Sequence, residues 1–265
     1  MKIAIGIEYD GSHFHGWQSQ PSGNTVQDHL ERALASVAGE PIRIAAAGRT
    51  DTGVHAMAQV AHFETQVSRP VSAWVRGVNA LLPNAVAVQW AQPVADGFHA
   101  RYSALSRSYR YVLYSHPVRP SLLHGKVGWF HQRLDLAAMR AALNHLEGEH
   151  DFSAFRSSEC QAKSPVRSLR LCTIEQSGAY FTFAFTANGF LHHMVRNIVG
   201  CLVYVGKGKH PPEWLAAIRV GRDRRFAAPT FSPDGLYLSA VEYAPEWDLP
   251  AFERKLMLHS EQVPA

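Results

Sequence analysis

A ten-residue segment at 47–56, AGRTDTGVHA, contains the residue types that nucleophilic and acid–base chemistry require. Its one carboxylate is Asp51, and Arg49 precedes it by two residues. Gly48 and Gly53 bracket the carboxylate and favour a tight turn, because glycine adopts backbone angles that residues with a Cβ resist. A single acid held in a turn beside cationic side chains indicates a reactive group. The alternative is an Asp that only caps the turn through its own backbone hydrogen bonds.

Asp51, Thr52 and Gly53 also match the Asp-Thr-Gly triplet of aspartic proteases. Those enzymes need two carboxylates that share a proton at close range. This chain has one such triplet, so a second copy would have to supply the other, and Arg49 beside Asp51 would oppose proton sharing. A dimeric protease is therefore an alternative that predicts peptide cleavage at acid pH.

The segments around this turn alternate between strand and helix patterns. In chain order they predict a strand at 2–9, a helix from 26 behind a capping box at Thr25, strands at 42–46 and 59–63, a helix between Pro70 and Pro83, and a strand at 86–92. This β-α-β-β-α-β order is the split βαβ pattern of a ferredoxin-like unit. Two of the expected strands therefore hold the Asp51 turn between them.

The second half of the chain repeats this order loosely. It predicts strands at 109–114 and 127–130, a helix at 135–146, a hairpin at 171–175 and 180–186, helices at 190–205 and 212–218, and a strand at 236–243. We therefore expect an α+β fold of two ferredoxin-like halves with mostly antiparallel sheets and the active cleft between them. The expected divisions are an N-terminal domain at 1–104 that carries Asp51, a C-terminal domain at 105–245 that completes the site, and a tail at 246–265.

The expected helix at 190–205 carries a cation on a face of its own. Its apolar residues form one stripe, and Arg196 projects to a different side. Gly200, four residues later, would permit another backbone to approach closely. His192 and His193 are not expected to form a metal site, because neighbours on a helix point about 100° apart and no third ligand is patterned nearby.

Composition bounds the class of protein. The chain has 265 residues, of which 46% are hydrophobic and 18% charged, and this balance is typical of a globular protein. Its net charge of +4 suits a nucleic-acid partner. The three cysteines match no zinc or redox spacing, which favours a reducing, cytoplasmic setting. No apolar run approaches the roughly 18 residues of a membrane span, so we expect no membrane partner.

The string at 48–55, Gly-Arg-Thr-Asp-x-Gly-Val-His, resembles the signature of the pseudouridine synthases, and most closely that of the TruA family. Thr52 stands where the family often has Ala. Further segments resemble the same family in the same order, so that the likeness extends from Lys2 to Tyr243: YDGS at 9–12 with GWQ at 16–18, FHAR at 98–101, YRY at 109–111, HHMVRNIVG at 192–200 and GLYL at 235–238.

The resemblance implies isomerisation of uridine to pseudouridine at tRNA positions 38, 39 and 40 in the anticodon stem-loop, with no cofactor and no metal. Asp51 would be the nucleophile, acting at C6 of uracil, at C1′ of ribose or along a glycal route, and Arg196 its ion partner. Tyr109 would be a stacking platform for the target base after it leaves its stack, and Leu236 would pack under that base. Arg49 would help to hold the flipped nucleotide through a phosphate, with a local ion pair to Asp51 as the alternative.

Basic side chains supply the expected contacts to tRNA. Arg101, Arg107 and Arg110 flank the proposed platform, and further groups stand at 163–170, 207–209 and 219–225. Phosphate contacts from such residues produce steep salt dependence. The resemblance also implies a homodimer in which one tRNA contacts both subunits. Two alternatives stay open: the same isomerisation on another RNA, and an RNA-binding or tRNA-folding protein in which catalysis is secondary.

Overall fold

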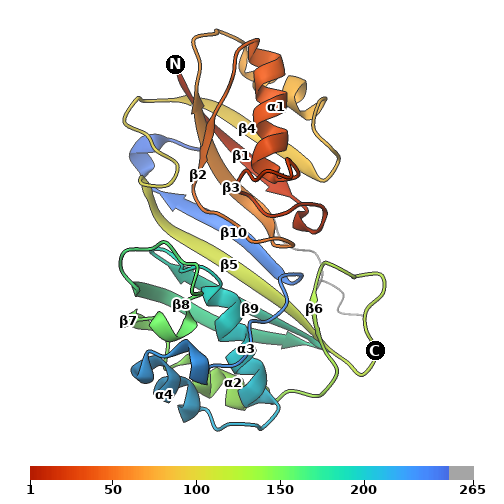
Figure 1. Cartoon of the computed structure of the whole chain (residues 1–265), viewed down its shortest axis with the longest axis vertical. Helices are drawn as coiled ribbons and strands as arrows, with labels where there is room; N and C mark the ends of the chain where they lie inside the picture. The colour runs from red at the N-terminus through yellow and green to blue at the C-terminus, as the bar shows by residue number, and fades with distance from the viewer. Residues whose placement is uncertain (251–265) are drawn as a thin grey trace.

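One ten-stranded, mostly antiparallel sheet runs along the molecule in the computed structural model of the chain, which describes residues 1–250 (Figure 1). Its strands are β1 (Lys2–Tyr9), β2 (Ile44–Ala46), β3 (His55–Glu64), β4 (Val86–Val94), β5 (Ala104–Ser115), β6 (Gly128–Phe130), β7 (Gly148–Asp151), β8 (Val166–Ser177), β9 (Tyr180–Ala187) and β10 (Leu236–Tyr243). The main order is β4-β1-β3-β10-β5-β9-β8-β7, with β2 paired to β3 and β6 to β5. The expected α+β class is confirmed.

Within residues 1–250, the last strand lies between β3 and β5 in the sheet. β10 pairs with β3 in parallel, through Tyr237 with His55 and Leu238 with Ala56, and with β5 in the antiparallel direction. β5 begins at Ala104. The last strand of the described residues therefore lies between β3, from early in the chain, and β5, from its middle.

In the described part of the chain, four α-helices cover one face of this sheet: α1 (Val26–Ala38), α2 (Leu136–Leu143), α3 (Met194–Gly206) and α4 (Glu213–Gly221). Figure 1 shows α1 on the first half and the other three on the second. Residues of α1, such as Leu30, and of α3, such as Ile198, belong to one continuous buried apolar cluster. Burial of that cluster is the main favourable term that holds both halves together.

Several helix boundaries follow from local signals. The Thr25 side chain accepts a hydrogen bond from the Asp28 amide at the start of α1, and Gly39 ends the helix with φ 75°, as the sequence predicts. The helix expected between Pro70 and Pro83 is shorter, with a π-helical turn at Ala73–Gly77. Five residues of the expected tail at 246–265 are described, and the rest of that tail lies outside the described residues.

The helix expected at 190–205 begins later than its apolar pattern indicated. His193 has φ 63°, a left-handed backbone that cannot continue a right-handed helix, so α3 begins at Met194. Both histidines therefore precede the helix. Within residues 1–250, no helix is long and apolar enough to cross a membrane.

Candidate active site

The turn that carries Asp51 lies between β2 and β3 and is fixed by hydrogen bonds. The Val54 amide donates to the Asp51 carbonyl over 3.1 Å, and Gly53 takes φ 80°, which closes the turn. The hydroxyl groups of Thr50 and Tyr9 lie 2.8 Å apart and are buried. Because the turn is closed by its own backbone hydrogen bond and Thr50 is bonded to Tyr9 of β1, the fold restricts the direction of the Asp51 side chain.

The N-terminal loop that carries Gly16 and Trp17 packs on the same turn. The Trp17 amide donates to the Thr50 carbonyl over 3.0 Å. Gly16 has φ 83°, and a Cβ there would lie 2.8 Å from that carbonyl oxygen. Glycine is thus required both for the backbone angle and for the close approach, which gives the Gly-Trp-Gln segment a structural role beside Asp51.

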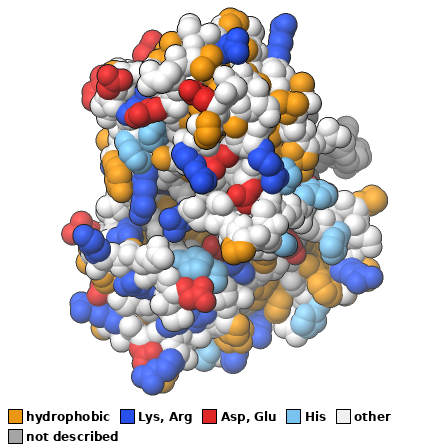
Figure 2. Space-filling model, turned by 45° about the horizontal axis from the view of Figure 1, so that its top comes forward, with side chains coloured by type: hydrophobic (Ala, Val, Ile, Leu, Met, Phe, Trp, Pro, Cys, Tyr) orange, Lys and Arg blue, Asp and Glu red, His pale blue; other side chains and the backbone are white. Residues whose placement is uncertain are grey.

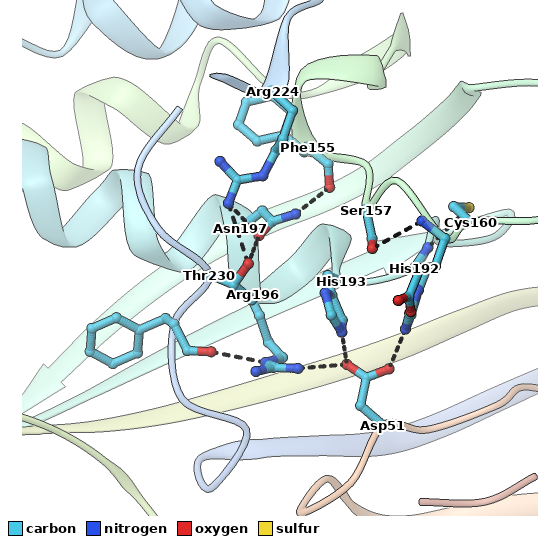
Figure 3. A network of polar contacts seen from close by, with 12 residues as sticks. Asp51, Phe155, Ser157, Cys160, His192, His193, Arg196, Asn197, Arg224 and Thr230 are labelled. Carbon is cyan, nitrogen blue, oxygen red and sulfur yellow. Dashed lines mark hydrogen bonds and ion pairs between the residues drawn. The ribbon is translucent and has the colours of Figure 1, made fainter. Parts of the chain in front are cut away.

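Three side chains from the second half of the chain meet the Asp51 carboxylate (Figure 3). Arg196 Nη1 lies 2.8 Å from Asp51 Oδ2. His192 Nε2 lies 3.3 Å from Oδ1, and His193 Nε2 lies 3.4 Å from Oδ2. The Asp51 side chain retains 20% of its exposure. The carboxylate is therefore half enclosed by groups that can carry positive charge, and it remains open to a partner from solvent.

Arg196 is held in place from its other side. Its Nε donates to the Phe231 carbonyl over 2.9 Å, and the Phe231 amide donates to the Arg196 carbonyl. One turn further along α3, a Cβ on Gly200 would lie 2.3 Å from the Pro229 carbonyl oxygen. The close backbone approach expected at Gly200 is confirmed. That approach brings the 229–231 segment close enough to orient the guanidinium.

Asn197, which the sequence reasoning did not single out, anchors α3 beside Arg196. Its side chain is fully buried. It donates through Nδ2 to the Phe155 carbonyl over 2.7 Å, and its Oδ1 accepts from Thr230 Oγ1 and Arg224 Nη2 (Figure 3). The available signal was a polar residue within an apolar helical stretch, because buried amides in such places are hydrogen-bonded.

The two histidines were also missed, for a reason that the structure makes clear. Helical spacing would point the two rings apart, but both residues precede α3, so the expectation that they do not act together is wrong. Their rings lie 4.0 Å apart between centroids, and both face Asp51. The ring nitrogens and an Asp51 oxygen lie within 4.8 Å of one another, a spacing that a metal ion would accept. Arg196 already supplies a positive charge at this carboxylate, so a metal ion bound there would lie beside a like charge.

Tyr109 and Leu236 are both buried, and Tyr109 lies close enough to Asp51 to interact with its charge. Tyr109 is 8% exposed and packs edge-on against Phe190, with ring centroids 4.9 Å apart. Burial raises the pKa of the Tyr109 phenol, and the nearby Tyr9 and Asp51 raise it further. Leu236 is 5% exposed and lies opposite Tyr111 in the register of β10 and β5. Tyr109 therefore keeps its phenolic proton at neutral pH.

Three of the arginines expected to contact tRNA, Arg49, Arg101 and Arg110, are exposed, but they lie on different parts of the structure. Arg49 is exposed, and its Nη1 donates to Gln161 Oε1 over 3.3 Å instead of forming the local ion pair with Asp51. Arg101 is exposed in the loop before β5. Arg110 is exposed on the face of β5 opposite to Tyr109, since neighbours on a strand point to opposite faces. Figure 2 shows Lys and Arg side chains around a hollow that crosses one face of the molecule.

Comparison with known proteins matches residues 5–103 and 142–244 to the family model described as tRNA pseudouridine synthase. The chain is 58% identical over 250 residues to a tRNA pseudouridine synthase A of Paraburkholderia xenovorans, with 94% of this chain and 93% of the relative covered. It is 59% identical over 250 residues to that of Dechloromonas aromatica, covering 94% and 95%. It is 58% identical over 258 residues to that of Aromatoleum aromaticum, covering 97% and 98%.

Proposed function

This chain belongs to the tRNA pseudouridine synthase family and is an isomerase of tRNA uridines, and from that premise we propose that it acts at positions 38, 39 and 40 of the anticodon stem-loop. Asp51 is the proposed nucleophile. The observation that carries this assignment is the 2.8 Å contact between Asp51 Oδ2 and Arg196 Nη1, which pairs the one acid of the signature turn with a guanidinium.

A carboxylate is the form of Asp that attacks carbon. Arg196 occupies Oδ2, which leaves Oδ1 with the longer contact to His192. Asp51 would add to C6 of uracil, add to C1′ of ribose or assist a glycal route. Each route breaks the N1–C1′ bond, turns the uracil and forms the C5–C1′ bond. The conversion rearranges one nucleotide without net oxidation or reduction, so the proposal includes no cofactor and no metal.

The target base must leave its stack to reach Asp51. Extrusion of the base costs a few kcal/mol of free energy. Stacking on an aromatic side chain offsets about 1–3 kcal/mol of that cost for each base. We assign the platform to Tyr109 and the packing beneath the base to Leu236. The exposed Arg49 would hold a phosphate of the extruded nucleotide. Arg101 and Arg110 would contact other parts of the tRNA.

The residues of the proposed active site come from two parts of the chain. Residues 1–104 supply the Asp51 turn, and residues 105–245 supply Arg196, Tyr109 and Leu236. Family membership and the net charge of +4 support a homodimer that binds one tRNA across both subunits. Light scattering after size-exclusion chromatography, with and without tRNA, tests this arrangement, and a monomer under both conditions would contradict it.

The deciding experiment measures tritium release from a tRNA transcript labelled at uracil C5, for the wild-type chain and for Asp51→Ala. C5–H is lost only when the new carbon–carbon bond forms, so release reports the isomerisation itself. We expect release by the wild type and none by Asp51→Ala, with tRNA binding retained. Sequencing the product for pseudouridine at 38, 39 and 40 tests the position. Binding without release by the wild type would favour the RNA-folding alternative.

A further inference from the structure

The proposed isomerisation requires a proton acceptor in addition to a nucleophile, because the uracil loses its proton at C5 and gains one at N1. On the C6 route Asp51 is still bonded to the substrate when C5 loses its proton, so its carboxylate is not free to accept it. On the C1′ and glycal routes the carboxylate is free again, but a carboxylate is ordinarily a much weaker base than a neutral imidazole. A neutral group of higher basicity beside Asp51 is therefore the better acceptor. The inference developed here rests on the proposed function.

The groups that face Asp51 differ in their ability to accept a proton. Within the described part of the chain, the titratable side chains that contact its carboxylate are Arg196, His192 and His193. Arg196 stays protonated in proteins and has no acceptor nitrogen. Tyr109 lies nearby, but burial raises its pKa, so its basic form is scarce at neutral pH. The two imidazoles are therefore the candidates.

His193 differs from His192 in its backbone. It takes φ 63°, one of three non-glycine residues with positive φ in the described chain, and makes no side-chain capping bond to α3. Such a conformation costs roughly 1 kcal/mol or more and persists only where the surroundings enforce it. Here it turns the imidazole back toward Asp51, with Nε2 at 3.4 Å from Oδ2. Its side chain keeps 28% of its exposure, so a substrate can reach it.

The charges around His193 favour its neutral form. Burial lowers the pKa of this imidazole, and His192 and Arg196 lower it further, whereas Asp51 and Glu159 act in the opposite direction. Together these effects place the pKa of His193 below the ordinary value of 6.5. At neutral pH the ring therefore has one N–H and one acceptor nitrogen, which is the form that a general base requires.

We propose that His193 is the catalytic base that removes the C5 proton of the target uracil and returns a proton to N1. After the C5–C1′ bond has formed, C5 still carries its hydrogen. The acceptor nitrogen of His193 takes that proton, and the C–H electron pair restores the C5=C6 double bond. The imidazolium then protonates N1, which left C1′ with the electron pair of the broken glycosidic bond. Exchange of the imidazolium proton with water accounts for release of a C5 label.

His193→Asn is the sharpest test, because Asn tolerates the left-handed backbone and keeps a polar side chain but cannot carry a proton. His193→Gly removes the ring and also relieves the backbone strain. Both are compared with wild type in single-turnover reactions on tRNA containing ordinary or 5-deuterated uridine, across pH and with added imidazole. His131→Asn, at an exposed histidine next to β6, is the matched control.

We expect both variants to bind tRNA but to react about 10²–10⁴-fold more slowly. A primary isotope effect at C5 should emerge because proton removal becomes rate-limiting. The acid limb of the pH profile should disappear, and imidazole should restore part of the rate in His193→Gly. His131→Asn should match the wild type.

Three outcomes would overturn the assignment. The first is reaction of His193→Gly at the wild-type rate. The second is slowing of both variants without an isotope effect or imidazole rescue, which would show a structural role. The third is the isotope effect and the rescue in a His192 variant, His192→Asn, which would make His192 the base. Absence of reaction by the wild-type chain would refute the proposed function itself and is distinguishable from all three.

Discussion

Arg196 Nη1 and Asp51 Oδ2 lie 2.8 Å apart, although 145 residues separate them in the chain. Their side chains retain 13% and 20% of their exposure, so the pair is largely shielded from water. Losing one partner of a buried pair commonly costs about 3–5 kcal/mol, because the other charge is left without compensation. The Asp51 carboxylate is therefore part of the contact between the first and second halves of the chain.

Arg196→Lys should lower turnover about 10²-fold while tRNA binding changes little. The guanidinium contacts the Phe231 carbonyl and Asp51 at the same time, and a lysine ammonium cannot reproduce that planar fork. Single-turnover tritium release and tRNA titration separate the two effects. Arg43→Lys is the control, because Arg43 is exposed and pairs with Glu31 away from the site. Unchanged turnover in Arg196→Lys would show that charge alone suffices.

Asn197→Leu should destabilise the fold by about 2–4 kcal/mol. The change removes the donor to the Phe155 carbonyl and the acceptor for Thr230 and Arg224, in a fully buried position. Urea unfolding followed by circular dichroism measures the loss, with the exposed Asn144→Leu as control. If the two variants unfold at the same urea concentration, the network contributes nothing to stability.

Gly200→Ala should destabilise the protein and weaken activity together. Its Cβ would lie 2.3 Å from the Pro229 carbonyl oxygen, so α3 or the 229–231 segment that orients Arg196 must move. Gly221→Ala on α4 meets no atom within 4 Å and has no positive φ, so it should be neutral or slightly stabilising. Thermal unfolding of both variants tests the difference, and equal melting temperatures would refute the packing argument.

Stability should fall as pH decreases from about 6.5 to 4, with His62 as one cause. Burial lowers the pKa of His62 to about 4, and the neighbouring His99 and Lys2 act in the same direction. The unfolded chain takes up a proton near pH 6.5 that the folded chain resists until about pH 4. The His62 contribution is thus present above pH 6.5 and lost as pH falls toward 4, by at most about 3 kcal/mol.

His62→Gln isolates this contribution, because Gln does not titrate and can still accept from the Ala100 amide that His62 Nδ1 binds. Urea unfolding of both proteins at pH 7 and pH 4.5 gives the comparison. The wild type should lose more stability than the variant between these two values. Parallel losses would assign the pH dependence to other groups, such as the buried His55.

Elements with strong local signals were predictable from the sequence. The alternation at 2–9 and the capping pattern at Thr25 lie within a few residues of the structure that they specify, so no distant contact is needed to interpret them. The signature turn could be found in the same way, because glycines on both sides of Asp51 specify a bend. The apolar stripe of α3 predicted its core face but misplaced its start at 190.

Tertiary structure decided what meets Asp51. The left-handed backbone of His193 is unfavourable on its own and follows from contacts that no local pattern encodes. The parallel pairing of β10 with β3, the burial of Asn197 and the turning of both histidines toward Asp51 likewise depend on residues far apart in the chain. The sequence by itself determined most of the elements and the turn that carries Asp51, whereas long-range packing determined the partners of that carboxylate, because side chains can pair only after the fold has brought them together.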